Sequence, residues 1–239
     1  MKPCHKVLIC SATKGELKGI KNLDVEKLAI GLPYPYDDGI DILITGVGYF
    51  STIYYLTKTI LLHEYCLVFA VGIAGDYRLE QPVPQLYVIN HAQFADTGFE
   101  NAEGGFTPLV GSPFLQGDTP PFSGTSLKSR FAKQFAQMFN LALCNVNTVS
   151  RTCTNTLYIS ELLKQFPAEI ETMESAALHY VALLENIPLI EIRATSNHVT
   201  PKQIEKWQIA KAVEMLTNFV NNNIHNTKIY EFKRIIYCA

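Results

Sequence analysis

Polar residues stand at both ends of one predicted helix–strand unit in the second half of the chain. Glu171 and Glu174 flank the start of the helix, and Arg193, Ser196 and Asn197 follow an apolar strand. Ligands of α/β proteins bind in the crevice at the carboxyl ends of the strands. We therefore expect both ends of this unit to face one pocket.

Each of these residues also has a structural explanation that needs no ligand. Glu174 suits the positive end of the helix dipole, and Ser196 and Asn197 suit a capped turn after the strand. Arg193 is harder to explain in this way, because a charge that leaves an apolar strand needs water or a carboxylate partner. We expect Glu174 to be that partner, and Glu16, which follows the first predicted strand, to project over the same edge of the sheet.

Carboxylates, an arginine, an amide and hydroxyls in one pocket suit hydrolysis or group transfer by general acid–base catalysis. The sequence has no GxSxG elbow, no P-loop and no evident covalent nucleophile. We expect no metal and no cofactor. The histidines that lack metal-ligand spacing, and that we expect at the surface or the edge of the core, are His5, His63, His91 and His179.

Three predicted strands early in the chain each run into a turn of small residues. The strands occupy residues 6–10, 42–45 and 67–71, and the turns occupy residues 11–15, 46–48 and 72–76. We predict helices from about residue 16 and over 51–62. Strands that alternate with helices predict an α/β fold with a parallel or mixed sheet covered on both faces. The small residues suit tight turns, and they also suit close approach of the backbone to a ligand.

The second half of the chain continues this pattern. Further predicted strands occupy 87–89, 141–149 and 189–192, and further helices occupy 127–139, 173–184 and 201–220. Residues 109–126 form a long irregular loop, which we expect to be functional or mobile. We predict one catalytic domain over 1–220, followed by a short β-like or loosely attached C-terminal tail over 221–239.

The composition is that of an ordinary globular protein. With 239 residues and a formal charge of −2, the chain lacks the basic stripe and the zinc-finger spacing of a nucleic-acid binder. Its six cysteines form no CxxC pair, which is typical of reduced cytosolic thiols. We find no secretory signal and no apolar run of membrane-spanning length. We therefore expect a cytoplasmic protein with neither a nucleic-acid nor a membrane partner.

Five short blocks together resemble the nucleoside phosphorylase/nucleosidase superfamily. They are Glu16 after the first strand, TGVG (45–48), VGIAG (71–75), TMES (172–175) and RATSN (193–197). Their spacing matches as well as their content, over nearly the whole chain up to about residue 220. Within the superfamily, GIAG, the Asn in SNHV and EKWQIAKAV (205–213) resemble the futalosine hydrolase branch. The resemblance implies a three-layer αβα fold of the phosphorylase/hydrolase type, with a central mixed and twisted sheet.

The resemblance also implies a role for each residue of the site. Glu16 would position and deprotonate a water molecule, and Asn197 would contact the purine at N7 and O6. Met173 would pack against the ribose, and Glu174, held by Arg193, would bind the 2′- and 3′-hydroxyls. The other substrate-binding residues that it implies are Gly72, Ile73 and Ser196.

Differences from related enzymes indicate the reaction. Methylthioadenosine nucleosidases carry an aspartate where this sequence has Asn197, and an amide suits the acceptors N7 and O6 of a 6-oxopurine. An amide cannot deliver a proton by ionising, so the source of the proton for N7 stays open. Ala70 and Ile73 stand where bacterial phosphorylases hold phosphate, and Glu16 would repel a phosphate dianion. These differences favour hydrolysis.

The resemblance therefore implies hydrolysis of a purine nucleoside, futalosine, to dehypoxanthinyl futalosine and hypoxanthine in menaquinone biosynthesis. The alternatives are a methylthioadenosine/S-adenosylhomocysteine-type nucleosidase, a purine nucleoside phosphorylase and a non-catalytic nucleoside-binding protein. Asn197 counts against the first alternative. The presence of both Glu16 and Glu174 counts against the last.

Several residues have more than one interpretation. The superfamily commonly forms dimers or larger homo-oligomers, and the aromatic regions 49–50 and 94–106 suit either a subunit contact or core packing. Asp76 and Arg151 depart from the family's pattern. Arg78 is a candidate partner for the benzoate carboxylate of futalosine.

Overall fold

The structure is a computed structural model that describes residues 6–100, 102, 104–152, 155–200, 207–225, 229, 231–233 and 236. Within these residues, nine strands form one mixed sheet in the order β10-β9-β5-β11-β4-β1-β3-β2, with β8 paired to β5. The strands are β1 Val7–Ser11, β2 Tyr34–Asp37, β3 Ile40–Ile44, β4 Leu67–Asp76, β5 Leu86–Phe94, β8 Leu127–Lys128, β9 Ala142–Thr148, β10 Ile170–Thr172 and β11 Leu189–His198. A separate two-stranded sheet pairs β6 Gly98–Glu100 with β7 Phe106–Pro108.

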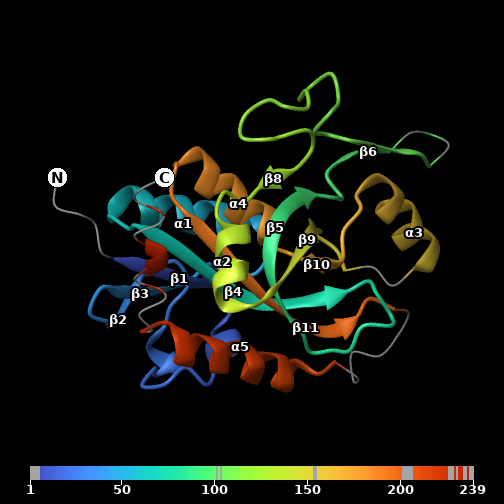
Figure 1. Cartoon of the computed structure of the whole chain (residues 1–239). Coiled ribbons are helices and arrows are strands. Elements are labelled where there is room, and N and C mark those ends of the chain that lie inside the picture. The colour runs from blue at the N-terminus through green and yellow to red at the C-terminus, as the bar shows by residue number, and fades with distance from the viewer. Residues whose placement is uncertain are drawn as a thin grey trace.

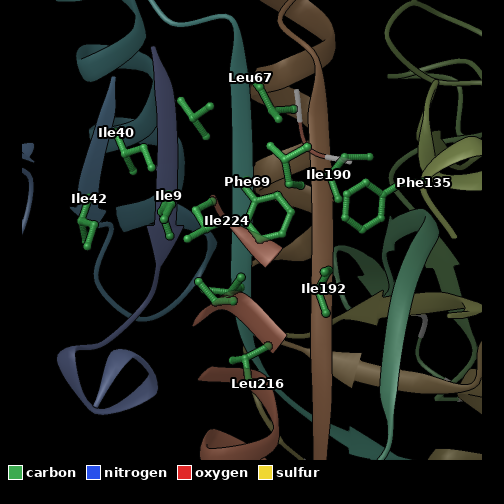
Figure 2. Packing of buried hydrophobic residues seen from close by; sticks show 14 of the residues in the cluster. Ile9, Ile40, Ile42, Leu67, Phe69, Phe135, Ile190, Ile192, Leu216 and Ile224 are labelled. Carbon is green, nitrogen blue, oxygen red and sulfur yellow. The ribbon is translucent and has the colours of Figure 1, made fainter. Parts of the chain in front are cut away.

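Helices cover both faces of the main sheet (Figure 1). They are α1 Tyr49–Leu62, α2 Ala132–Phe139, α3 Thr156–Gln165, α4 Ser175–Leu184 and α5 Ile209–Asn223, with the 3-10 turns η1 Lys14–Leu17 and η2 Val25–Lys27. On one face, Leu56 of α1 and Leu178 of α4 share an apolar cluster with the sheet. On the other, Phe135 of α2 and Leu216 of α5 pack with Phe69 of β4 (Figure 2). This arrangement confirms the predicted three-layer α/β fold.

The strands at the centre of the sheet are apolar because they are covered on both faces. Every residue of β1 and of β3 is buried, as expected for parallel strands between two helical layers. Successive side chains alternate between the layers. Leu8 therefore joins the cluster of α1 and α4, while Ile9 joins the cluster of α2 and α5.

Two central strands, β4 and β11, are longer than the sequence predicts. Each has ten residues, and the two pair in parallel from one end to the other. The predicted turn at 72–76 and the polar residues 193–198 therefore lie within strands, and the predicted strand ends at 71 and 192 are wrong. The reason is that each strand is extended by its partner, which no pattern inside either strand reveals. β10 pairs with both β9 and β4, and it closes the curled sheet beside the carboxyl end of β4.

Four predicted elements correspond to elements of the structure, namely 51–62 to α1, 87–89 to β5, 141–149 to β9 and 173–184 to α4. Some other predicted elements differ from the structure. The helix predicted from about residue 16 is the single turn η1. The helix predicted over 127–139 starts only at Ala132, because Leu127 and Lys128 pair with β5. Residues 201–206 of the last predicted helix lie outside the described residues. This helix also ends later than predicted, because α5 continues to Asn223.

The C-terminal tail also differs from its prediction. Residues 229, 231–233 and 236 are helical. Ile229, Phe232 and Ile236 are buried in the cluster of α2 and α5. Their spacing of three and four residues places them on one face of a helix. The prediction of a β-like or loosely attached tail is therefore wrong for the described residues.

Candidate active site

A cavity of about 380 Å³ lies at the carboxyl ends of β4, β10 and β11. Both ends of the helix–strand unit line it, with Glu171 to Glu174 on one side and Ser196 and Asn197 on another, which confirms that they share a pocket. Glu16 of η1 and Ile73 of β4 also line it. Gly72 and Arg193 are not among the described lining residues, and they lie behind Glu16 and Ile73.

Glu16 is held by donors from three parts of the chain. Its Oε2 accepts hydrogen bonds from the Ser11 hydroxyl at 3.0 Å, and from the backbone N–H and hydroxyl of Thr13 at 2.9 and 3.0 Å. Its Oε1 accepts from the backbone N–H of Ile73 at 3.0 Å. Because Thr13 also caps η1 in a capping box, the turn itself aims the carboxylate. The structure thus fixes one carboxylate at the wall of the cavity.

Gly72 leaves space above the sheet for the side chains of Arg193 and Glu16. A Cβ atom at this position would overlap Nη1 of Arg193 and lie 2.8 Å from Oε1 of Glu16. The backbone of Gly72 is therefore close to both groups, and any side chain would displace them. Gly72 makes room for these groups, and its predicted place among the substrate-binding residues stays a prediction.

Arg193 is buried among carboxylates. Its Nε lies 2.7 Å from Oε1 of Glu191, while its Nη1 lies 3.6 Å from Oε2 of Glu174. Nη1 also donates to the backbone carbonyl of Ile73 at 3.3 Å. The predicted ion pair with Glu174 is present, but Glu191 is the closer partner. The sequence carried a signal for it, because residues two apart on a strand lie on the same face.

Glu191 is the centre of a buried polar network. Its Oε1 accepts from the Ser175 hydroxyl at 2.6 Å, and its Oε2 lies 3.0 Å from Nε2 of His179. Burial alone would raise the pKa of Glu191, but the charge of Arg193 and the bonds from His179 and Ser175 outweigh it and hold the pKa at about 2. His179 is 2% exposed, so its predicted place at the surface or the edge of the core is wrong.

Glu174 joins the TGVG block to the wall of the cavity. It occupies the N-cap of α4, and its Oε1 accepts from the backbone N–H of Gly48 at 2.9 Å. Burial raises the pKa of Glu174, while Arg193 and the Gly48 bond act in the opposite direction. Gly48 has a φ of 87°, a conformation that favours glycine. The turn therefore serves the site, because it presents an N–H to the carboxylate beside Met173.

The amide of Asn197 is oriented by its neighbours. Its Oδ1 accepts from the Ser196 hydroxyl at 2.8 Å, and its Nδ2 donates to the carbonyl of His198 at 3.2 Å. The pairing of β11 with β4 shifts register between Thr195 and Asn197, and such a bulge re-aims side chains. Ser196 and Asn197 thus face the cavity from within a strand, and the alternative of a capped turn is wrong.

The residues of uncertain role are now placed. Asp76 is fully buried, and Arg78 donates to both of its carboxylate oxygens at 2.9 and 2.8 Å. Arg78 is therefore already paired, and it is not among the described residues that line the cavity. After β9, Thr152 lines the cavity. Arg151 instead lies over the ring of Tyr158, 5.6 Å from its centre.

Two further properties hold for the described part of the chain. It contains no group of three or more His, Cys, Asp or Glu side chains that could hold a metal ion. None of its helices has both the length and the apolar character needed to cross a membrane.

The chain is similar to known proteins in sequence and in fold. The sequence model of a family described as the Phosphorylase superfamily matches residues 38–228. A futalosine hydrolase of Streptomyces coelicolor is 31% identical over 188 residues, which is 77% of each chain. Two Helicobacter pylori structures share the fold at low identity. They are a 5′-methylthioadenosine/S-adenosyl homocysteine nucleosidase (TM-score 0.71, 17% identity, 95% of this chain and 99% of the other) and a futalosine hydrolase (0.70, 16%, 91% and 96%).

We predict that Glu191→Gln both destabilises the protein and impairs its activity. Loss of one partner of a buried ion pair costs about 3–5 kcal/mol, and Arg193 would lose its closest carboxylate. Denaturant unfolding measures the first effect, and kcat/KM measures the second. The matched control is Glu161→Gln, which breaks an exposed pair with Lys164 and should cost less than about 1 kcal/mol. Equal stability of the two variants would contradict a supporting role for Glu191.

Proposed function

We propose that this chain cleaves futalosine to dehypoxanthinyl futalosine and hypoxanthine. The chain belongs to the phosphorylase superfamily, and it is a nucleosidase, which is an N-glycosyl hydrolase. The observation that carries the proposal is the oriented amide of Asn197 in the cavity wall. The 31% identity with a futalosine hydrolase supports it. On the same ground we place the reaction in menaquinone biosynthesis.

The base is recognised by the free donor of Asn197. Because Oδ1 accepts from Ser196 and one N–H is bound to the carbonyl of His198, the second N–H of Nδ2 is left for a ligand. A 6-oxopurine presents two acceptors, N7 and O6, to such a donor. Adenine keeps the acceptor N7 but carries an amino donor in place of O6, so it offers the amide one acceptor rather than two. This difference favours a hypoxanthine leaving group over an adenine one.

The two fixed carboxylates act on the other reacting groups. Glu16 accepts a proton from the attacking water as the water oxygen bonds to C1′ and the C1′–N9 bond breaks. Glu174 binds the 2′- and 3′-hydroxyls of the ribose, and Met173 packs against the sugar. Because Arg193 lies behind both carboxylates, the geometry of the site is set before the substrate binds.

The lining of the cavity favours water over phosphate as the nucleophile. Among its described lining residues there is no lysine, arginine or histidine, while Glu16, Glu171 and Glu174 bring carboxyl groups. Ala70 points into the apolar cluster beneath α1 and α4, and Ile73 lines the cavity with an apolar side chain. A phosphate dianion would meet no cation there and would be repelled. Phosphorolysis is therefore the weaker alternative.

We expect a substrate comparison to support futalosine hydrolysis. Futalosine should release hypoxanthine at the same rate with and without phosphate. Methylthioadenosine should react at least about 100-fold more slowly in kcat/KM, since its adenine leaves the amide donor badly matched. Chromatography of the released bases, with aminofutalosine and inosine in the same panel, provides the measurement. Faster cleavage of inosine plus phosphate, or of methylthioadenosine, would refute the assignment.

We predict that Glu16→Gln abolishes turnover but leaves nucleoside binding intact. The amide keeps the shape of the side chain but cannot accept the proton of the water, and loss of a general base costs about 100- to 10,000-fold in rate. Steady-state kinetics and calorimetric binding of the substrate separate the two properties. Glu26→Gln, an exposed change close in sequence, is the control. Normal turnover by Glu16→Gln would exclude this mechanism.

We also propose that the chain forms a homo-oligomer through a surface beside the cavity. Val47, Phe50 and Tyr54 are 57%, 75% and 59% exposed, and Val47 also lines the cavity. Exposed apolar clusters of this kind mark protein contacts. Of the two aromatic regions considered, the second belongs partly to the core, because Phe94 lies 6.4 Å from the ring of Tyr180.

Sedimentation should therefore show a dimer or larger species for the unmodified protein, and Phe50→Asp should shift it towards the monomer. The control is Phe114→Asp, which alters another exposed ring, in the 109–126 loop. A monomeric unmodified protein would rule out this surface as a subunit contact.

A further inference from the structure

We propose that Glu171 is the general acid that protonates the departing purine, an assignment that rests on the nucleosidase function proposed above. Asn197 holds the base but has no proton to give. A purine that leaves without a proton leaves as an anion, which a site lined by carboxyl groups would disfavour. A second group close to Asn197 must therefore deliver the proton.

The register of three adjoining strands brings Glu171 and Asn197 together. Gly75 of β4 pairs with Glu171 of β10 on one side and with Asn197 of β11 on the other. A Cβ atom at position 75 would lie 3.3 Å from Cγ of Glu171 and 3.5 Å from Nδ2 of Asn197. Both side chains thus extend over the same glycine, and both line the cavity. A base held by Asn197 has Glu171 as its neighbour.

The surroundings of Glu171 suit a group that gives up a proton near neutral pH. Burial raises the pKa of Glu171, the hydrogen bond from Tyr77 lowers it, and the charge of Asp96 raises it, with a result of about 7. The Tyr77 hydroxyl donates to Oε2 at 2.8 Å, which directs the acidic proton to Oε1. Among the described residues, the other titratable groups of the cavity wall are Glu16 and Glu174.

The reaction is balanced with Glu171 as acid and Glu16 as base. The electron pair of the C1′–N9 bond moves to the purine, and the proton of Glu171 goes to N7, so hypoxanthine leaves neutral. The water oxygen bonds to C1′, and one water proton goes to Glu16. Exchange with solvent then returns a proton to Glu171 and removes one from Glu16. Enzymes commonly use two carboxyl groups in this way near neutral pH, one as the general acid and the other as the general base.

We expect Glu171→Gln to lower kcat on futalosine by about 100- to 10,000-fold with little change in KM. The unmodified enzyme needs Glu171 protonated, so its kcat/KM, which reports the ionisation of the free enzyme, should fall as pH rises through about 7. That decline should be absent from the residual activity of Glu171→Gln. Tyr77→Phe removes a bond that lowers the pKa of Glu171, so the decline should move to higher pH.

A leaving group that needs no proton separates catalysis from structure. With 4-nitrophenyl β-ribofuranoside, which releases a stable phenolate, Glu171→Gln should keep most of its activity. Glu174→Gln, which alters the ribose contact, should lose activity on both substrates. The assignment would be overturned if Glu171→Gln lost the same share of activity on both substrates. It would also be overturned if Glu171→Gln changed KM alone and left the pH profile intact.

The substrate panel distinguishes the proposal that futalosine is the substrate from the proposal that Glu171 is the general acid. If the unmodified enzyme releases no hypoxanthine from futalosine, the substrate proposal fails. The role of Glu171 is then tested on whichever purine nucleoside of the panel the enzyme does cleave, because N7 is common to all of them.

Discussion

The site depends on one buried cation, the guanidinium of Arg193. It lies between Glu191, at 2.7 Å, and Glu174, at 3.6 Å, and it passes over Gly72 beside Glu16. Several carboxylates removed from water repel one another and lose hydration, and a shared cation offsets both costs. Without Arg193, the carboxylates of Glu16, Glu174 and Glu191 would repel one another with no cation to offset the repulsion.

The long parallel pairing of β4 with β11 places this cation at the cavity. The first half of β4 is apolar, and the first half of β11 is apolar except for the buried pair Glu191 and Arg193. The second half of each strand carries mainly small or polar residues. The same pair of strands thus provides a stable support and a reactive end. β10 completes the wall, since it pairs with β4 and brings Glu171 beside Asn197.

The sequence predicted much of this arrangement but not its long-range part. The prediction that Glu16, Glu174 and Asn197 lie at one cavity is confirmed, because a change from apolar to polar residues along a strand and a carboxylate at a helix start are visible in the local pattern. The pairing of Glu191 with His179 was missed, because it joins α4 to β11 across the fold. The full length of β11 was missed for a related reason, since its polar half is stabilised by pairing with β4.

The glycines of β4 also limit how this protein can be stabilised. Replacing glycine by alanine often stabilises a protein, because the unfolded chain loses freedom, and it favours an extended strand. At Gly72 the added methyl group would displace Arg193 and Glu16, and at Gly75 it would lie 2.7 Å from Val199 and close to Glu171. The carboxyl half of β4 is therefore a region where stability and activity oppose each other, and thermostable variants should carry their changes elsewhere.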